Sequence, residues 1–88
     1  MENIVLSLKA GTSAVLQNGM AALCLGGRTQ PARDPLQAAL IRTLSDGPRT
    51  VEALTTFVHA RGGPQCTEAD AALTLAGFIL DFKEYLES

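Results

Sequence analysis

The spacing of apolar residues divides the chain into an extended amino-terminal part and a helical part that begins near residue 34. Apolar residues fall at every second position from Ile4 to Leu8, which is the period of a half-buried strand. A second extended run ends at Asn18-Gly19, a dipeptide typical of two-residue hairpin turns because both central residues adopt positive φ. The return strand is expected over Met20–Leu25, and a third extended piece over Arg28–Ala32. We therefore expect a two- or three-stranded antiparallel sheet between about residues 3 and 32.

Three helices are predicted after the strands, over about residues 35–45, 50–61 and 68–86. Asp34 followed by Pro35 is typical of a helix start, because the carboxylate accepts hydrogen bonds from free backbone amides and proline suits the first turn. Thr50 is expected to cap the amino terminus of the second helix in the same way. Thr67 and Asp70 have the spacing of a capping box for the third helix.

The last helix has apolar residues on two faces, whereas a small domain needs only one. At about 100° per residue, one face collects the residues expected in the core: Leu75, Phe78, Ile79, Phe82, Tyr85 and Leu86. The opposite face collects Ala69, Leu73, Ala76 and Leu80. We expect the helix to run unbroken to about Tyr85, with Leu73 and Leu80 markedly more exposed than the first face. An uncovered apolar stripe indicates a partner, and the alternative is that the chain's own strands cover it.

The order of elements predicts an α+β fold that is winged helix-turn-helix-like, with an N-terminal two- or three-stranded antiparallel sheet followed by three helices. The short joint Asp46–Thr50 between the first two helices suits a helix-turn-helix. A chain of 88 residues forms one domain, which we expect to span residues 1–88. In many winged helices the wing hairpin follows the third helix, whereas here the hairpin precedes the helices.

Composition and charge favour a globular protein and disfavour nucleic acid as a partner. The chain is 47% hydrophobic and 18% charged, and its net charge is −2. Nucleic-acid modules usually have a positive excess that neutralises phosphates. The alternative of a DNA-binding winged helix-turn-helix regulator needs basic residues on the exposed face of the third helix. Between residues 67 and 88, Lys83 is the single basic residue among several acidic ones.

No pattern of residues indicates catalysis, so we expect a protein that is not an enzyme and has no cofactor. The single histidine, His59, cannot complete a catalytic triad. Cys24 and Cys66 lie far apart without a Cys-x-x-Cys motif, which leaves too few ligands for a metal. We expect both to be thiols, and a disulfide between them stays open. The sequence has no signal peptide and no membrane-spanning run, so we predict a cytoplasmic protein with no membrane partner.

Three segments and their order resemble a known class of peptide-binding domain. The segments are Leu36–Leu44, Gly47–Leu54 with the spacing Gly-x-x-Thr-x-x-x-Leu, and Ala69–Leu86. The chain is similar over nearly its whole length to the precursor-peptide recognition element of ribosomally synthesised, post-translationally modified peptide pathways. Similar domains are the N-terminal winged helix of azoline-oxidising flavin dehydrogenases and the peptide chaperone of pyrroloquinoline quinone biosynthesis. The chain departs from that pattern at Pro31, where a regular third strand would run, and no closing segment is expected after the third helix.

The resemblance implies non-catalytic binding of a precursor leader peptide, which is then delivered to a modifying enzyme of the same pathway. The leader would add as a strand to the sheet edge and raise the effective concentration of the peptide at the enzyme. On this mapping Ala69, Leu73, Ala76 and Leu80 floor a groove, and Thr29 and Gln30 lie on or near the receiving edge, with Met20–Leu25 as the alternative edge. A homodimerisation or subunit-docking module, in which Leu73 and Leu80 meet a copy or a larger enzyme, is a further alternative. The sequence leaves open which peptide is bound and whether the domain belongs to a longer enzyme.

Overall fold

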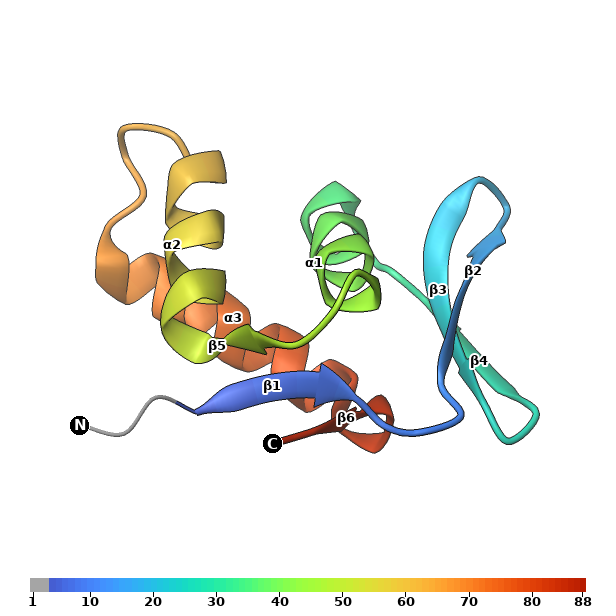
Figure 1. Ribbon diagram of the computed structural model, residues 1–88. Helices are drawn as coiled ribbons and strands as arrows, with labels where there is room; N and C mark the ends of the chain where they lie inside the picture. Colours follow the sequence, from blue (N-terminus) through green and yellow to red (C-terminus); the bar gives the residue numbers. More distant parts are fainter. Residues whose placement is uncertain (1–3) are drawn as a thin grey trace.

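The computed structural model describes residues 4–88 as an α+β arrangement of three helices and two three-stranded antiparallel sheets (Figure 1). One sheet has the order β2-β3-β4, formed by Ser13–Gln17, Met20–Leu25 and Arg28–Pro31. The other has the order β5-β1-β6, formed by Arg49–Thr50, Val5–Leu8 and Leu86–Glu87. The helices are α1 (Pro35–Ser45), α2 (Val51–Arg61) and α3 (Glu68–Asp81), and a 3₁₀ turn, η1 (Lys83–Tyr85), follows α3.

Two successive two-residue turns build the β2-β3-β4 sheet. Asn18 and Gly19 have φ of 54° and 80°, which confirms the predicted hairpin between β2 and β3. Gly26 and Gly27 have φ of 58° and 83° and form a second hairpin of the same kind between β3 and β4. Because β3 is paired along both sides, Met20–Leu25 cannot receive another strand, and that alternative edge is wrong.

The first strand joins a second sheet that the sequence pattern did not predict. Val5 pairs with Thr50 of β5, and Leu8 pairs with Leu86 of β6. The expectation of a single amino-terminal sheet is therefore wrong for β1. The two partner strands have two residues each, which is too short for an alternating pattern to be visible. Strand β6 is also a closing segment after the third helix, where none was expected.

Helix α3 ends at Asp81, so the prediction of an unbroken helix to about Tyr85 is wrong. Phe82 has φ −115° and ψ 18°, outside the helical range, and the 3₁₀ turn follows it. Leu86 is already extended, and the backbone amide of Lys9 donates to the carbonyl oxygen of Tyr85 at 2.9 Å. Pairing with β1 thus overrides the helical period. Phe82, Tyr85 and Leu86 are nevertheless buried, as predicted.

The predicted helix starts are confirmed by hydrogen bonds. The Asp34 carboxylate accepts from the backbone amide of Gln37 at 2.8 Å, and Thr50 caps α2 in the same way. At the start of α3, the amide of Asp70 donates to the hydroxyl oxygen of Thr67 at 3.0 Å, and the amide of Thr67 donates to the carboxylate of Asp70 at 3.1 Å. This reciprocal pair is a complete capping box.

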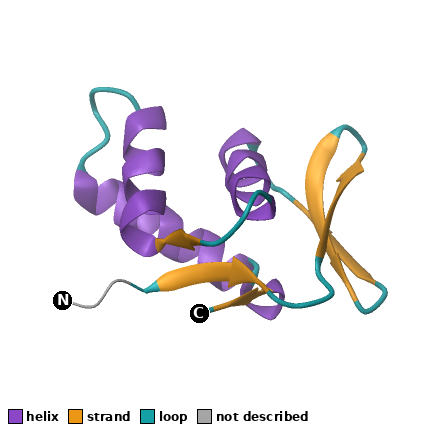
Figure 2. Cartoon of the chain, in the orientation of Figure 1, coloured by secondary structure: helices purple, strands orange, loops and turns teal. Residues whose placement is uncertain are grey.

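The core lies where the three helices meet β1 and β3, and α1 stands between α2 and the β2–β3 hairpin (Figure 2). Its largest fully buried side chains are Phe78, Phe82, Leu23, Leu40, Ile41, Leu54, Leu75 and Val58. The rings of Phe78 and Phe82 lie 5.1 Å apart between centroids, and those of Phe82 and Tyr85 lie 6.1 Å apart. Within residues 4–88, none of the helices has the length and apolar character needed to cross a bilayer.

Candidate binding groove

The outward face of α3 is apolar and uncovered. Leu73 is 74% exposed and Leu80 is 68% exposed, as predicted. Ala69 and Ala76 are also exposed. The alternative in which the chain's own strands cover this stripe is therefore wrong. We refer to Ala69, Leu73, Ala76 and Leu80 together as the α3 crest.

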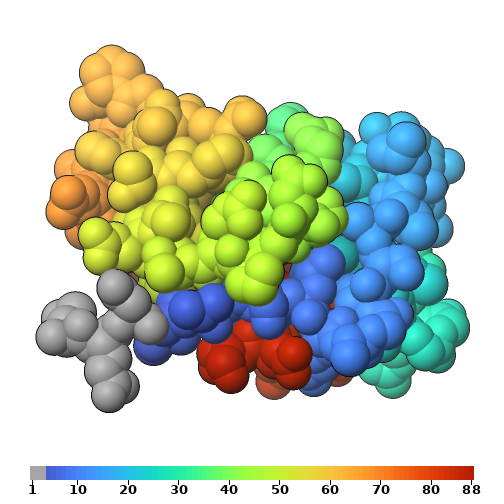
Figure 3. Space-filling model, viewed as in Figure 1, coloured from blue at the N-terminus to red at the C-terminus, as the bar shows by residue number. Residues whose placement is uncertain are grey.

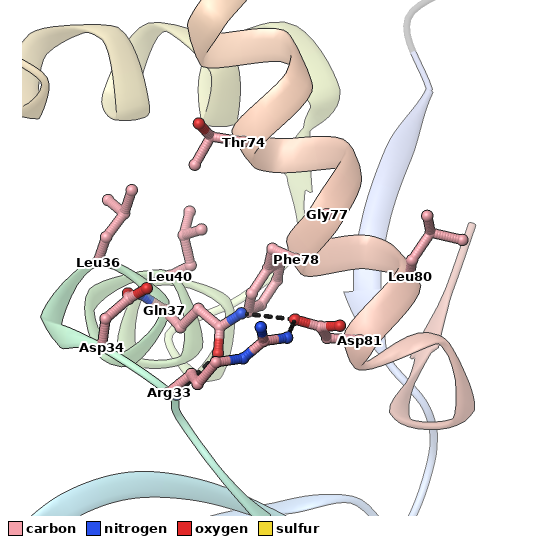
Figure 4. Close-up of a pocket in the computed structure, with 10 residues that line it drawn as sticks. All are labelled: Arg33, Asp34, Leu36, Gln37, Leu40, Thr74, Gly77, Phe78, Leu80 and Asp81. Carbon is pink, nitrogen blue, oxygen red and sulfur yellow. Dashed lines mark hydrogen bonds and ion pairs between the residues drawn. The ribbon is translucent and has the colours of Figure 1, made fainter.

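A groove runs beside the crest, between α3 and the first turns of α1 (Figure 4). Its larger hollow, of about 390 Å³, is lined by Arg33, Asp34, Leu36, Gln37, Leu40, Thr74, Gly77, Phe78, Leu80 and Asp81. A second hollow, of about 290 Å³, is lined by Pro35, Leu36, Val58, Arg61, Gly62, Cys66 and Thr74. Leu36 and Thr74 border both hollows. We refer to these two neighbouring hollows together as the α1–α3 groove, with Leu36 and Thr74 at the border between them.

Leu80 is the one residue of the predicted crest that lines the groove. Ala69, Leu73 and Ala76 lie on the exposed surface of α3 outside both hollows. On a helix with 3.6 residues per turn, the groove-facing positions 74, 77 and 81 are centred about 100° around the axis from the crest. The crest therefore lies beside the groove and does not form its floor. Beneath the groove lie side chains that the periodicity had assigned to the core: Leu36, which is half-buried, and Leu40 and Phe78, which are fully buried.

Gly77 is a groove residue that the apolar period did not predict, although its position in the sequence is unusual. Glycine in the middle of a helix is less favourable than alanine by about 1 kcal/mol. A Cβ added at Gly77 would meet no heavy atom within 4 Å, and its φ is not positive. Neither a close contact nor the local backbone requires glycine here. The missing side chain leaves one wall of the groove open.

The carboxyl end of α3 is joined to β4 and to α1 through Asp81. Its backbone carbonyl oxygen accepts a hydrogen bond from Nε2 of Gln30 in β4 at 2.8 Å. Its carboxylate pairs with the Arg33 guanidinium and accepts from Nε2 of Gln37 at 2.9 Å (Figure 4). Gln30, a predicted edge residue, is therefore held beside the end of the groove at which Leu80 lies.

Strand β4 is an edge strand with a small set of free backbone groups. The amide of Ala32 donates to the carbonyl oxygen of Ala21 at 2.8 Å. Because the bonding direction alternates along an antiparallel strand, Thr29 and Pro31 direct their backbone groups away from β3. Pro31 has no amide hydrogen. The outer edge of β4 therefore offers the amide and carbonyl of Thr29 and the carbonyl of Pro31.

The charges around the groove are mixed, because Arg61 adds a basic side chain to the second hollow. The arginines at its β4 end are paired, Arg33 with Asp81 and Arg28 with Glu84, the latter at 2.6 Å. The carboxyl-terminal part of the chain offers Lys83 as its one basic side chain. Phosphate would be repelled by the acidic side chains of α3.

The two cysteines and the single histidine are the remaining candidate groups of the sequence. Within residues 4–88, no three side chains of His, Cys, Asp or Glu are grouped as metal ligands. Cys24 and Cys66 are both half-buried thiols that do not form a disulfide. His59 is exposed in the last turn of α2, where a positive charge is favourable.

Comparison of the chain with protein-family models, with curated protein sequences and with solved structures finds no match.

Proposed function

We propose that this chain is a winged helix-turn-helix-like domain that binds an extended peptide segment in the α1–α3 groove without catalysing a reaction. The observation that carries this proposal is Gly77, which keeps a groove wall open at a cost in helix stability and without a packing reason inside the chain. The sequence resemblance makes a precursor leader peptide the expected occupant. The domain would then deliver that peptide to a modifying enzyme of the same pathway.

The floor of the groove defines the side chains that it suits. Leu36 is half-buried and Leu80 is exposed, and both border the larger hollow, so an apolar side chain of the peptide gains by packing against them. Complete burial of one Leu- or Ile-sized side chain is worth about 1.5–3 kcal/mol. Leu36 and Thr74 border both hollows of the groove. This arrangement suits two apolar side chains of one peptide, one in each hollow.

The edge of β4 supplies a place for main-chain pairing at the Leu80 end of the groove. Thr29 can donate one hydrogen bond and accept one, and Pro31 can accept one more. Each such bond contributes about 0.5–1.5 kcal/mol net. The missing amide of Pro31 limits the pairing to this short stretch. Ordering a flexible peptide opposes these gains, so we expect a Kd on the order of 1–100 µM and a negative heat-capacity change of binding.

The α3 crest favours a second interaction, with the modifying enzyme, in addition to peptide binding. Leu73 and Ala76 stay outside the groove, so they remain exposed when a peptide fills it. An apolar surface beside a peptide site suits docking of the modifying enzyme. The docking alternative and peptide recognition therefore use different residues of the same helix.

The test is a titration with fluorescently labelled synthetic peptides that correspond to the amino-terminal segments of small proteins encoded in neighbouring genes. Gly77→Leu places a side chain in the groove, and Ala76→Leu places the same side chain one position away on the crest. We expect Gly77→Leu to weaken binding by about tenfold or more and Ala76→Leu to bind like the unmodified chain. Leu80→Asp should likewise weaken binding more than Leu73→Asp. Equal affinities for the Gly77 and Ala76 variants, or no binding by the unmodified chain to any neighbouring leader, would overturn the proposal.

A further inference from the structure

Strand β2 forms an exposed edge of the β2-β3-β4 sheet, opposite to β4 (Figure 1). All five residues from Ser13 to Gln17 are exposed. Leu16 is 77% exposed, more than either leucine of the α3 crest, and Val15 is 40% exposed. In the space-filling view this hairpin lies at the right-hand end of the molecule (Figure 3). An exposed strand with apolar side chains is a site at which another strand can pair.

The two edges of this sheet differ in the features that usually prevent strand pairing. Strand β4 contains Arg28 and Pro31, and charge and proline restrict pairing at this edge to the short stretch around Thr29. Strand β2, with the sequence Ser-Ala-Val-Leu-Gln, contains neither. The edge that lacks these features is also the one with the most exposed leucine of the chain's described part. This contrast makes β2 the more open of the two edges.

The backbone of β2 has a defined set of free groups. Gln17 and Met20 flank a two-residue turn and therefore form a hydrogen-bonded pair. Alternation then directs the backbone groups of Val15 towards β3 and those of Ala14 and Leu16 away from it. The outer edge consequently offers two amides and two carbonyls. This set is larger and more balanced than the one on β4.

We propose that β2 pairs antiparallel with β2 of a second copy of this chain, about a two-fold axis at Val15. In that register Val15 faces the partner subunit's Val15, and Ala14 faces the partner subunit's Leu16. Each outward amide then meets an outward carbonyl, so four hydrogen bonds satisfy all the free groups of both edges. No charged residue of β2 meets a like charge, because the strand has none. The two sheets become one continuous sheet with the order β4-β3-β2-β2-β3-β4.

The dimer contact and the α1–α3 groove consist of different residues. Dimerisation and peptide binding can therefore be tested, and rejected, independently. Strand β4, which borders the groove, stays at the outer edge of the joined sheet. Each copy would therefore keep its own groove open. A pairing of two five-residue strands is a small contact, and we expect a dissociation constant on the order of 10 µM to 1 mM.

The test is sedimentation equilibrium of the full chain over about 10 µM to 1 mM. We expect a monomer–dimer equilibrium for the unmodified chain. Leu16→Lys should shift it to monomer by placing charge at the edge, and Ala14→Pro should do so by removing an outward amide while leaving the bonds to β3 in place. Leu73→Lys is the matched control, because it makes the same change at a similarly exposed leucine on the α3 crest. That variant should dimerise like the unmodified chain.

Amide hydrogen exchange provides a second readout that needs no variant. Raising the concentration of the unmodified chain should slow exchange at Ala14 and Leu16, whereas Val15 should be protected at every concentration. A monomer throughout the concentration range, or a dimer that Leu73→Lys dissociates and the β2 variants do not, would overturn the proposal. Protection of Ala14 and Leu16 by an added leader peptide in a monomeric chain would also overturn it, because β2 would then be a peptide edge.

Discussion

Gln30 and Asp81, which are 51 residues apart, are joined by a hydrogen bond of 2.8 Å between the side-chain Nε2 and the backbone carbonyl oxygen. Asp81 is the last residue of α3, and the last carbonyls of a helix have no partner within it. The bond therefore satisfies a helix end and at the same time holds β4 beside α3. The proposed peptide path depends on this placement.

Replacing Gln30 with alanine should lower the free energy of unfolding by about 0.5–1.5 kcal/mol, because the Asp81 carbonyl loses its partner. The same variant should weaken peptide binding, since β4 is less firmly held at the end of the groove. Urea denaturation measures the first effect, and peptide titration measures the second. Gln17→Ala on exposed β2 is the control and should change neither. An unaltered unfolding free energy in Gln30→Ala would show that the bond does not hold β4.

Replacing Gly77 with alanine should raise the free energy of unfolding by about 0.5–1 kcal/mol, because alanine is the better helix former and its Cβ has open space. Gly63→Ala is a matched control, since a Cβ there also meets nothing within 4 Å but φ is 78°. That variant should be destabilised, because alanine is strained at positive φ. Denaturation midpoints of the two variants should move in opposite directions. A loss of stability in Gly77→Ala would mean that the groove wall is closed by the chain itself.

Phe82→Ala should lower the free energy of unfolding by about 3–5 kcal/mol, as for other buried aromatic truncations. Phe82 is fully buried and lies against the rings of Phe78 and Tyr85. Lys83→Ala, at the exposed neighbouring position, should change stability by less than about 0.5 kcal/mol. A cost below about 1 kcal/mol for Phe82→Ala would show that this residue is not in the core.

The Asn18-Gly19 turn gives a prediction about the backbone alone. Gly19 has φ of 80°, and a Cβ added there would meet no heavy atom within 4 Å. Gly19→Val should therefore cost about 1–3 kcal/mol through backbone strain and not through a clash. Gly77→Val introduces the same side chain at a position without positive φ and should be tolerated better. Thermal unfolding compares the two variants, and an unchanged melting temperature for Gly19→Val would place the hairpin turn elsewhere.

Features encoded by adjacent residues could be predicted from the sequence. The Asn18-Gly19 hairpin, the Asp34 cap and the Thr67–Asp70 capping box each depend on residues within four positions of one another. The exposure of Leu73 and Leu80 also followed from the helical period, because neighbouring turns of one helix fix which residues share a face.

Features that depend on distant residues could not be predicted in this way. Helix α3 ends at Asp81 because Leu86 pairs with Leu8, and no local pattern encodes a partner 78 positions away. The sequence pattern does not predict the groove for a related reason, since Leu36 and Leu40 have the spacing of core residues. The space beside them arises because α1 and α3 do not pack directly against each other there. The mid-helix glycine at Gly77 was the one local signal of this gap.

The most direct test of the central claim is an amide chemical-shift map of the isotopically labelled chain as the neighbouring leader peptide is added to saturation. Peptide bound in the α1–α3 groove should perturb Thr29 on β4 together with Gly77 and Leu80 on α3. It should also slow exchange of the Thr29 amide, which donates to the added strand. Perturbations confined to Ala69 and Leu73 on the α3 crest, or no perturbation at any peptide concentration, would contradict peptide recognition by this groove.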